Sequence, residues 1–173
     1  SSAASDVYKR QVYKLTQEDE KARKLENVRK LWDAILEIRP VKNVFMEGDI
    51  NRESYAVDHF IPRNFVMNDE LWNLMPMDPI QNMQKNKKLP AWNDYFEQFA
   101  NNQFIMYELI HEKPGLQKLY KHCYKDNLHS IWAVQELYRK GNSPSEFINI
   151  LGKNMQPVYD SARRQGYEIW KVS

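Results

Sequence analysis

The sequence predicts an α+β fold that is mostly helical and contains one small unit of two short strands and a short helix. Apolar residues recur every three or four positions before residue 40 and after residue 90, which is the helical period. Between these positions two β-prone runs flank a Glu-Gly-Asp turn signal and precede a segment interrupted by prolines. The strands are therefore expected in the middle of the chain, between helical parts.

The composition is that of a folded protein rather than a disordered one. A chain of 173 residues with 42% hydrophobic and 13% aromatic residues has enough apolar surface for one domain with a core. The single cysteine, Cys123, excludes an internal disulfide framework and indicates a reducing compartment. No apolar run approaches the roughly 20 residues that cross a bilayer, so we expect a cytoplasmic protein without a membrane partner. The net charge of +2 gives only a weak overall attraction to a polyanion, so nucleic-acid binding would depend on local basic clusters.

The N-terminal part is predicted to contain a leader and one helix. Residues 1–11 are small and polar without periodicity, which is typical of a non-native leader. Thr16 and Asp19 offer a cap for a helix that we expect over residues 12–40. Its apolar face consists of Leu25, Val28, Trp32 and Ile35.

Residues 41–90 are predicted to form the unit of strands and helix. The β-prone runs over 41–46 and 54–60 are separated by a turn signal, which predicts a hairpin. The second run delivers Asp58 and His59 to the end of its strand. These two side chains would point to opposite faces unless the strand ends or twists there.

The rest of this unit is predicted to be a loop followed by a short helix. Residues 61–77 fit neither periodic template, and we expect an ordered loop. A proline at the first helical turn is tolerated because its missing N–H has no intrahelical partner. Pro79 therefore opens a short helix over 79–88, which ends before Pro90.

Residues 91–173 are predicted to be helical and to belong to the same domain. Six large apolar residues share one helix face: Trp92, Tyr95, Phe96, Phe99, Met106 and Leu109. A second helix face gathers Leu128, Ile131, Trp132 and Leu137. Two shorter helices are expected to follow, one after the cap signal at Ser143 and one over 155–165.

The joint spacing of a few polar residues is the most informative feature of the sequence. Asp58 and His59 are adjacent at a strand end, Asn73 lies 14 residues after His59, and Asn82 lies 23 residues after it. Asp58 and Asn82 offer hard oxygen ligands, which favour Mg²⁺ or Mn²⁺ over Zn²⁺. An imidazole such as that of His59 can accept a proton from water near neutral pH. These groups are the ones that hydrolysis of a phosphodiester requires.

The segment from Asp58 to Lys85 resembles the HNH endonuclease family, also called ββα-metal nucleases. It is most similar to variants with Asp first and Asn last, as in the HNH domains of CRISPR effector nucleases and many bacterial and phage HNH proteins. The resemblance implies a ββα-metal nuclease core that hydrolyses phosphodiester bonds in DNA. It implies one Mg²⁺ (or Mn²⁺) held by Asp58 and Asn82, with His59 as the general base. Asn73 would tie the loop and help to orient His59.

The basic residues near this segment are expected to contact the substrate. Lys85 matches the lysine of an Asn-x-x-Lys segment in the family pattern, which implies a contact with the scissile phosphate. Lys87, Lys88 and Arg63 are expected to contact the DNA backbone. Many HNH proteins carry two Cys-x-x-Cys pairs that hold a structural zinc, and this sequence has none. A DNA-recognition domain is not evident either, so we expect a further domain or a partner protein outside this chain.

Two other functions are compatible with the sequence. The same scaffold could bind nucleic acid or protein without chemistry, and this would leave binding without metal-dependent cleavage. Alternatively, the chain is a helical interaction domain in which the Asp-His pair is accidental. In that case the oxygens of Asp58 and Asn82 would lie too far apart to share one cation.

Overall fold

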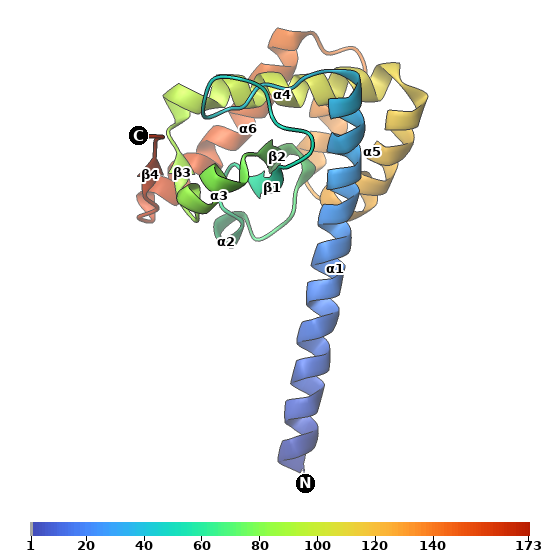
Figure 1. The fold of residues 1–173 in the computed structure, drawn as a ribbon, viewed down its shortest axis with the longest axis vertical. Coiled ribbons are helices and arrows are strands. Elements are labelled where there is room, and N and C mark those ends of the chain that lie inside the picture. The colour runs from blue at the N-terminus through green and yellow to red at the C-terminus, as the bar shows by residue number, and fades with distance from the viewer. Residues whose placement is uncertain (1) are drawn as a thin grey trace.

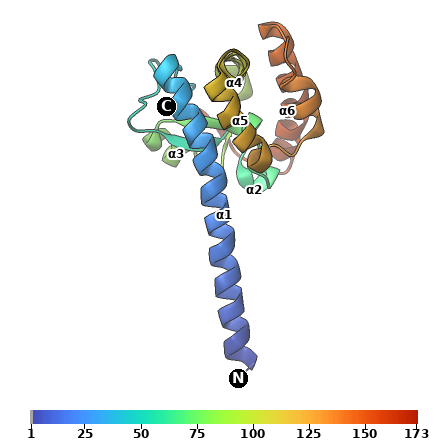
Figure 2. The same cartoon turned by 90° about the vertical axis from the view of Figure 1, so that its right-hand side faces the viewer.

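One long helix and a body of shorter helices with two small sheets make up the fold (Figure 1). The structure is a computed structural model that describes the backbone of residues 2–173 and the side chains of residues 3–10 and 25–173. Figure 2 shows α4 (Trp92–Glu112) and α5 (Pro114–Asn127) between α1 (Ser2–Ile38) and α6 (Pro144–Arg164). The predicted fold class is confirmed. Among the described residues, no helix has the length and hydropathy to cross a membrane.

Helix α1 is longer than the sequence predicted. It begins at Ser2 and ends at Ile38, whereas the helix was expected over 12–40, so the cap at Thr16 is wrong. The side chains of Thr16 and Asp19 lie outside the described residues. The C-terminal part of α1 packs against α5 and turns its apolar face into the core (Figure 1). The fully buried residues of this face are Val28, Leu31, Trp32 and Ile35.

The first sheet joins β1 (Ala56–His59) to β2 (Leu74–Met77) in antiparallel register. The strand predicted over 41–46 is wrong, because this segment forms only one isolated bridge and buries Val41, Val44 and Phe45 in the core. The loop predicted over 61–77 is wrong at its end, where β2 lies. Pro76 lies within β2, opposite Val57, because an edge strand tolerates proline.

Two short helical turns connect β1 to β2, and a longer helix follows. They are α2 (Arg63–Val66) and η1 (Leu71–Asn73). Helix α3 (Pro79–Lys85) is capped at its N-terminus by Asp78. The Oδ1 of Asp78 accepts hydrogen bonds from the backbone N–H groups of Ile80 and Gln81, both at 3.0 Å. The predicted short helix is therefore present and ends three residues earlier than expected.

The C-terminal region is helical, as predicted, but its last two helices are one. Helix α6 begins with a capping box, in which the Ser143 hydroxyl accepts from the Glu146 N–H at 3.2 Å. It continues through Pro157, so the break expected near residue 155 is wrong. Buried apolar residues lie both before and after Pro157, and their packing against the rest of the protein stabilises the helix. A short π-helical turn, η2 (Ala133–Leu137), lies between α5 and α6.

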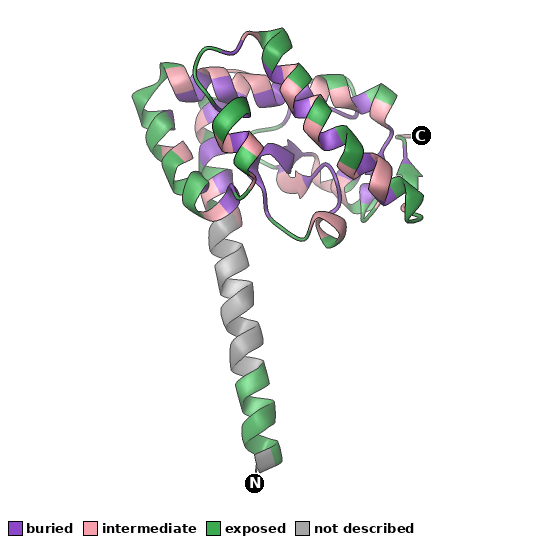
Figure 3. Cartoon of the chain, turned by 180° about the vertical axis from the view of Figure 1, so that it is seen from behind, coloured by how far each residue is buried: buried purple, intermediate pink, exposed green. Residues whose placement is uncertain are grey.

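Large aromatic residues fill the core where α4 meets the first sheet. Phe60 lies just after β1, and its ring centroid is 4.5 Å from that of Phe99. Figure 3 shows the buried residues, in purple, where the helices and the sheet meet. A second, parallel sheet pairs β3 (Leu89–Pro90) with β4 (Ile169–Trp170), and β3 also contacts α4. Trp170 is buried there against Phe45, at 4.9 Å between ring centroids.

Candidate active site

Asp58 and His59 occupy the end of β1, and their side chains have different surroundings. In the register of the sheet, Asp58 lies opposite Met75 and His59 opposite Leu74. The strand ends at His59, and one further hydrogen bond follows in the same register, from Phe60 N–H to the carbonyl of Asn73 at 2.9 Å. The strand end therefore presents a partly buried carboxylate and, beside it, a buried imidazole.

Lys85 joins the last turn of α3 to the end of β1. Its Nζ donates to Asp58 Oδ2 at 2.9 Å and to the carbonyl oxygen of His59 at 2.7 Å. The Lys85 side chain is 1% exposed and that of Asp58 is 17% exposed. A buried ammonium needs such partners because it has lost its water shell. Lys85 thus holds the helix against the strand and neutralises one oxygen of Asp58.

Asn82 lies one turn before Lys85 and faces the same carboxylate. One end of its side-chain amide is 3.2 Å from both Oδ1 and Oδ2 of Asp58. With the amide nitrogen at this end, Asn82 donates to both oxygens. With the amide turned over, its oxygen stands there instead, beside the carboxylate.

The separation of these oxygens suits a shared Mg²⁺. Octahedral Mg²⁺ with ligands at about 2.1 Å sets neighbouring ligand oxygens about 3 Å apart. The 3.2 Å between the Asn82 amide and the Asp58 carboxylate is close to this spacing. Within the described side chains, no three His, Cys, Asp or Glu residues form a metal-binding group. A cation at this place would rest on one carboxylate and one amide, which suits an ion that keeps water and phosphate ligands.

His59 is held by a carboxylate that the sequence reasoning missed. Its Nε2 lies 2.8 Å from Oδ1 of Asp69, and the side chain of Asp69 is 4% exposed. Arg63 Nε donates to the same oxygen at 2.9 Å. When Nε2 carries the proton toward Asp69, Nδ1 is left with a lone pair. The only sequence signal for Asp69 was its place in the loop between His59 and Asn73.

The charge of Asp69 is stabilised by these two neighbours. Burial raises the pKa of its carboxyl, but the hydrogen bond and charge of His59, followed by the charge of Arg63, outweigh burial and hold the pKa below its ordinary value. Asp69 is therefore an anion at neutral pH. An anion on one side of an imidazole favours the protonated ring that forms when His59 accepts a proton.

Asn73 ties the loop after β1 to the start of β2. Its side-chain oxygen accepts from Ile61 N–H at 2.9 Å, and its Nδ2 donates to Ile61 C=O at 2.8 Å. Within the described part of the chain, no hydrogen bond joins Asn73 to the His59 ring. Asn73 is fully buried and fixes the backbone next to His59.

A cavity of about 290 Å³ opens onto this cluster. Asp58, His59 and Lys85 line it on one side, and Arg63 and Lys87 line it on another. Lys88, by contrast, does not line the cavity and is partly buried. Arg63 and Lys87 thus lie within reach of an anion in the cavity.

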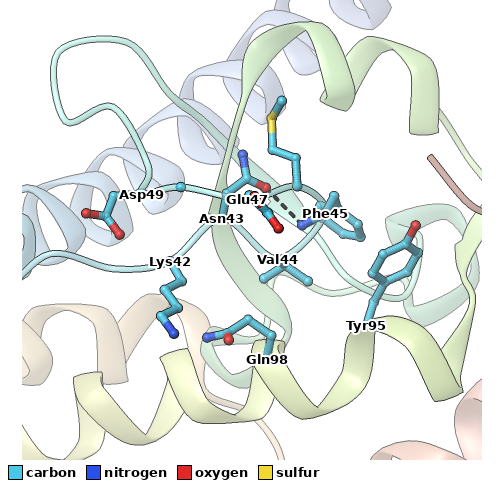
Figure 4. Close-up of a pocket in the computed structure, with 10 residues that line it drawn as sticks. Lys42, Asn43, Val44, Phe45, Glu47, Asp49, Tyr95 and Gln98 are labelled. Carbon is cyan, nitrogen blue, oxygen red and sulfur yellow. Dashed lines mark hydrogen bonds between the residues drawn. The ribbon is translucent and has the colours of Figure 1, made fainter. Parts of the chain in front are cut away.

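Another cavity, of about 520 Å³, lies between residues 42–49 and α4 (Figure 4). None of the predicted site residues lines it. The Asn43 side chain, which faces this cavity in Figure 4, accepts a hydrogen bond from Phe45 N–H at 2.9 Å. Its amide therefore shapes the turn, and we assign the cavity no role.

Comparison with known proteins identifies the central segment. Residues 45–91 match a family model described as HNH endonuclease, a family whose members act on nucleic acid and typically use a divalent metal. No curated protein and no solved structure matches the chain. The matched segment contains both strands of the first sheet, α3 and the residues gathered around Asp58. Residues 45–91 of this chain are thus similar to an HNH endonuclease domain.

Proposed function

We propose that this protein is a metal-dependent endonuclease that hydrolyses phosphodiester bonds in DNA. The closeness of three side chains carries the proposal: Asp58 and His59 line one cavity, and the amide of Asn82 lies 3.2 Å from the Asp58 carboxylate. This is the arrangement that hydrolysis needs, namely two oxygen ligands for a cation and a base beside them. The helical-interaction alternative requires these groups to be far apart, which the 3.2 Å contact between Asn82 and Asp58 disfavours.

In this proposal, Asp58 and Asn82 hold one Mg²⁺ or Mn²⁺. The cation supplies Lewis-acid stabilisation of charge on the phosphate and the leaving oxygen. Asn82 can hold it only when its amide oxygen faces Asp58, so we expect the amide to turn over on metal binding. Lys85 keeps Asp58 in place by occupying its Oδ2, which leaves Oδ1 for the cation.

His59 is the proposed general base. Its Nε2 is bonded to Asp69, so Nδ1 is the atom that accepts a proton from the attacking water. Asp69 holds the ring in this tautomer and stabilises the imidazolium. Asn73 supports the same geometry by fixing the backbone at Ile61.

Arg63 and Lys87 are the proposed contacts to the DNA backbone, because both line the cavity and carry charges that attract phosphate. The family pattern implied that Lys85 contacts the scissile phosphate. Its buried ammonium already has two partners, which supports a positioning role through Asp58 instead. Lys88 is the weakest of the predicted contacts, since it does not line the cavity.

Cleavage of supercoiled plasmid DNA in the presence of Mg²⁺ or Mn²⁺ tests the proposal. We expect the parent protein to cut and His59→Ala to cut about 10²- to 10⁴-fold more slowly, the usual contribution of a general base. His129→Ala is the matched control, because His129 is exposed and lies outside the cavity. Equal cutting by the parent and His59→Ala contradicts the proposal. Binding of DNA without metal-dependent cutting would support a binding module instead.

A further inference from the structure

A separate cavity of about 260 Å³ lies next to the nuclease cavity and shares the α2 segment with it. Arg63 and Asn64 of this segment line the nuclease cavity, whereas Phe65 and Val66 line the second one. The other walls come from residues 68–72, residues 130–132 and helix α6. A ligand in this second cavity would therefore lie just across one helical turn from the proposed catalytic groups.

Glu70 provides a carboxylate that is incompletely bonded in this cavity. The residue is 3% exposed, and its Oε2 accepts from Ser130 Oγ at 2.7 Å and from the indole N–H of Trp72. Among the described residues, both donors to Glu70 bond to Oε2, and Oε1 is not one of the enclosed polar atoms that lack a partner, so Oε1 is open to the cavity. An acceptor oxygen that faces a cavity without a protein donor can accept hydrogen bonds from a ligand there.

Aromatic side chains make up part of the remaining lining, beside two asparagines and two valines. Trp132 is partly exposed and packs on Trp72, with 5.1 Å between ring centroids. Phe65 is also partly exposed, and its outer edge contacts Tyr167 at 5.5 Å between ring centroids. Nucleobases stack on such side chains, and this contact contributes strongly in proteins that bind single strands. An aromatic wall beside a hydrogen-bond acceptor thus fits the face and the edge of a base.

We propose that this cavity binds a guanine base of the substrate, next to the cleaved phosphate. The proposal rests on the nuclease function proposed above. A carboxylate has about four acceptor positions, and the Ser130 and Trp72 donors use two of them in Glu70. Both protein donors use Oε2, so the positions that are left are both on Oε1. Guanine presents two adjacent donors on its Watson–Crick edge, its ring N–H and its amino group, and both can donate to this one oxygen. Adenine and cytosine offer a single donor group at this edge beside acceptors.

NMR titration with single nucleotides tests the inference. The chain has five tryptophans, and the indole N–H signal of Trp72 reports directly on its hydrogen bond to Glu70. We expect dGMP, in EDTA, to shift the Trp72 and Trp132 indole signals saturably. Its affinity should be at least tenfold higher than those of dAMP, dCMP and TMP, because only guanine satisfies Glu70.

Two variants locate the effect at the carboxylate. Glu70→Gln keeps the shape but replaces one acceptor oxygen by a donor, so the preference for dGMP should disappear. Glu136→Gln is the matched control, since Glu136 is an exposed carboxylate outside the cavity and should leave the titration unchanged. The comparison of four nucleotides in the parent protein needs no variant and remains valid if Glu70→Gln does not fold.

Three results would overturn the inference. They are the absence of saturable shifts with dGMP, equal affinities for the four nucleotides, and an unchanged preference in Glu70→Gln. A response to tetramethylammonium without a response to dGMP would instead assign the cavity to a cationic side chain of a protein partner. Because the titration contains no metal and no cleavable DNA, its result is independent of the plasmid assay. If the protein cuts DNA but does not bind dGMP, only this inference is contradicted. If it binds dGMP but does not cut DNA, only the proposed function is contradicted.

Discussion

Two neighbouring parts of the molecule are held together by different interactions. In the nuclease region, residues 56–85, buried polar side chains bond to one another and to the backbone across long sequence separations. In the helical region, residues 92–164, aromatic and aliphatic side chains pack on the faces of α4, α5 and α6. A buried polar network admits few arrangements that satisfy every group, whereas apolar packing tolerates many. The buried polar network therefore suits an active site, which needs atoms in fixed positions. The apolar helical packing suits the scaffold that supports this site.

The largest effect is expected from Lys85→Met in the nuclease region. The change removes the ammonium and leaves Asp58 Oδ2 and the His59 carbonyl without their donor. Breaking a buried ion pair from one side costs about 3–5 kcal/mol, which chemical denaturation would measure as a lower free energy of unfolding. Lys87→Met is the matched control, because Lys87 is exposed and should change stability by less than about 0.5 kcal/mol. Equal stabilities of the two variants would show that Lys85 does not hold the region together.

A smaller effect, on activity, is expected from Asp69→Asn. The amide can no longer stabilise a protonated His59, so we expect cleavage at neutral pH to slow by about 10- to 100-fold, as for other groups that orient a catalytic side chain.

The acid stability of this variant provides a second readout. The pKa of Asp69 is lowered from its ordinary value of 3.8. The stability that its ionisation contributes is therefore present above pH 3.8 and is lost as the pH falls through the lower folded-state pKa. Asp69→Asn should lack this part of the acid transition, whereas Glu53→Gln, at an exposed carboxylate, should keep it. An unchanged cleavage rate in Asp69→Asn would contradict the role of Asp69.

The smallest effect is expected from Ser143→Ala in the helical region. The change removes one half of the capping box at the start of α6, and such a cap contributes about 1 kcal/mol. Thermal unfolding should show a modestly lower midpoint, while the cleavage rate stays that of the parent. Ser54→Ala, at an exposed serine before β1, is the control. A loss of activity after Ser143→Ala would mean that the two regions are coupled more tightly than their separate interactions indicate.

The same contrast explains what could be predicted from the sequence. The helical period located α4 and the buried face of α1 because apolar packing leaves a repeating pattern. It failed at Pro157, because a proline within a long helix is outweighed by the apolar face on both sides of it. The strand partner of β1 was also predicted wrongly, because strand pairing between distant segments leaves no local signal in the sequence.

The residues of the site were found in part. Asp58, His59 and Asn82 were predicted from residue type and spacing; the structure places Asp58 and His59 on one cavity and Asn82 beside Asp58, and their roles remain predictions. Asp69 was missed because its partner, His59, lies ten residues away across an irregular loop. The burial of Lys85 was missed as well, since a lysine near a helix end is ordinarily solvated. Long-range partners of charged groups require the folded chain.

Binding of Mn²⁺, followed by electron paramagnetic resonance, tests the central claim most directly. The titration uses His59→Ala protein with duplex DNA, so that the phosphate is present and the DNA stays intact. We predict one bound Mn²⁺ per chain and at least tenfold weaker binding when Asn82→Ala is added. Asn64→Ala, at an exposed residue of the same cavity, should bind Mn²⁺ as the starting protein does. Equal affinities with and without the Asn82 side chain would contradict the account.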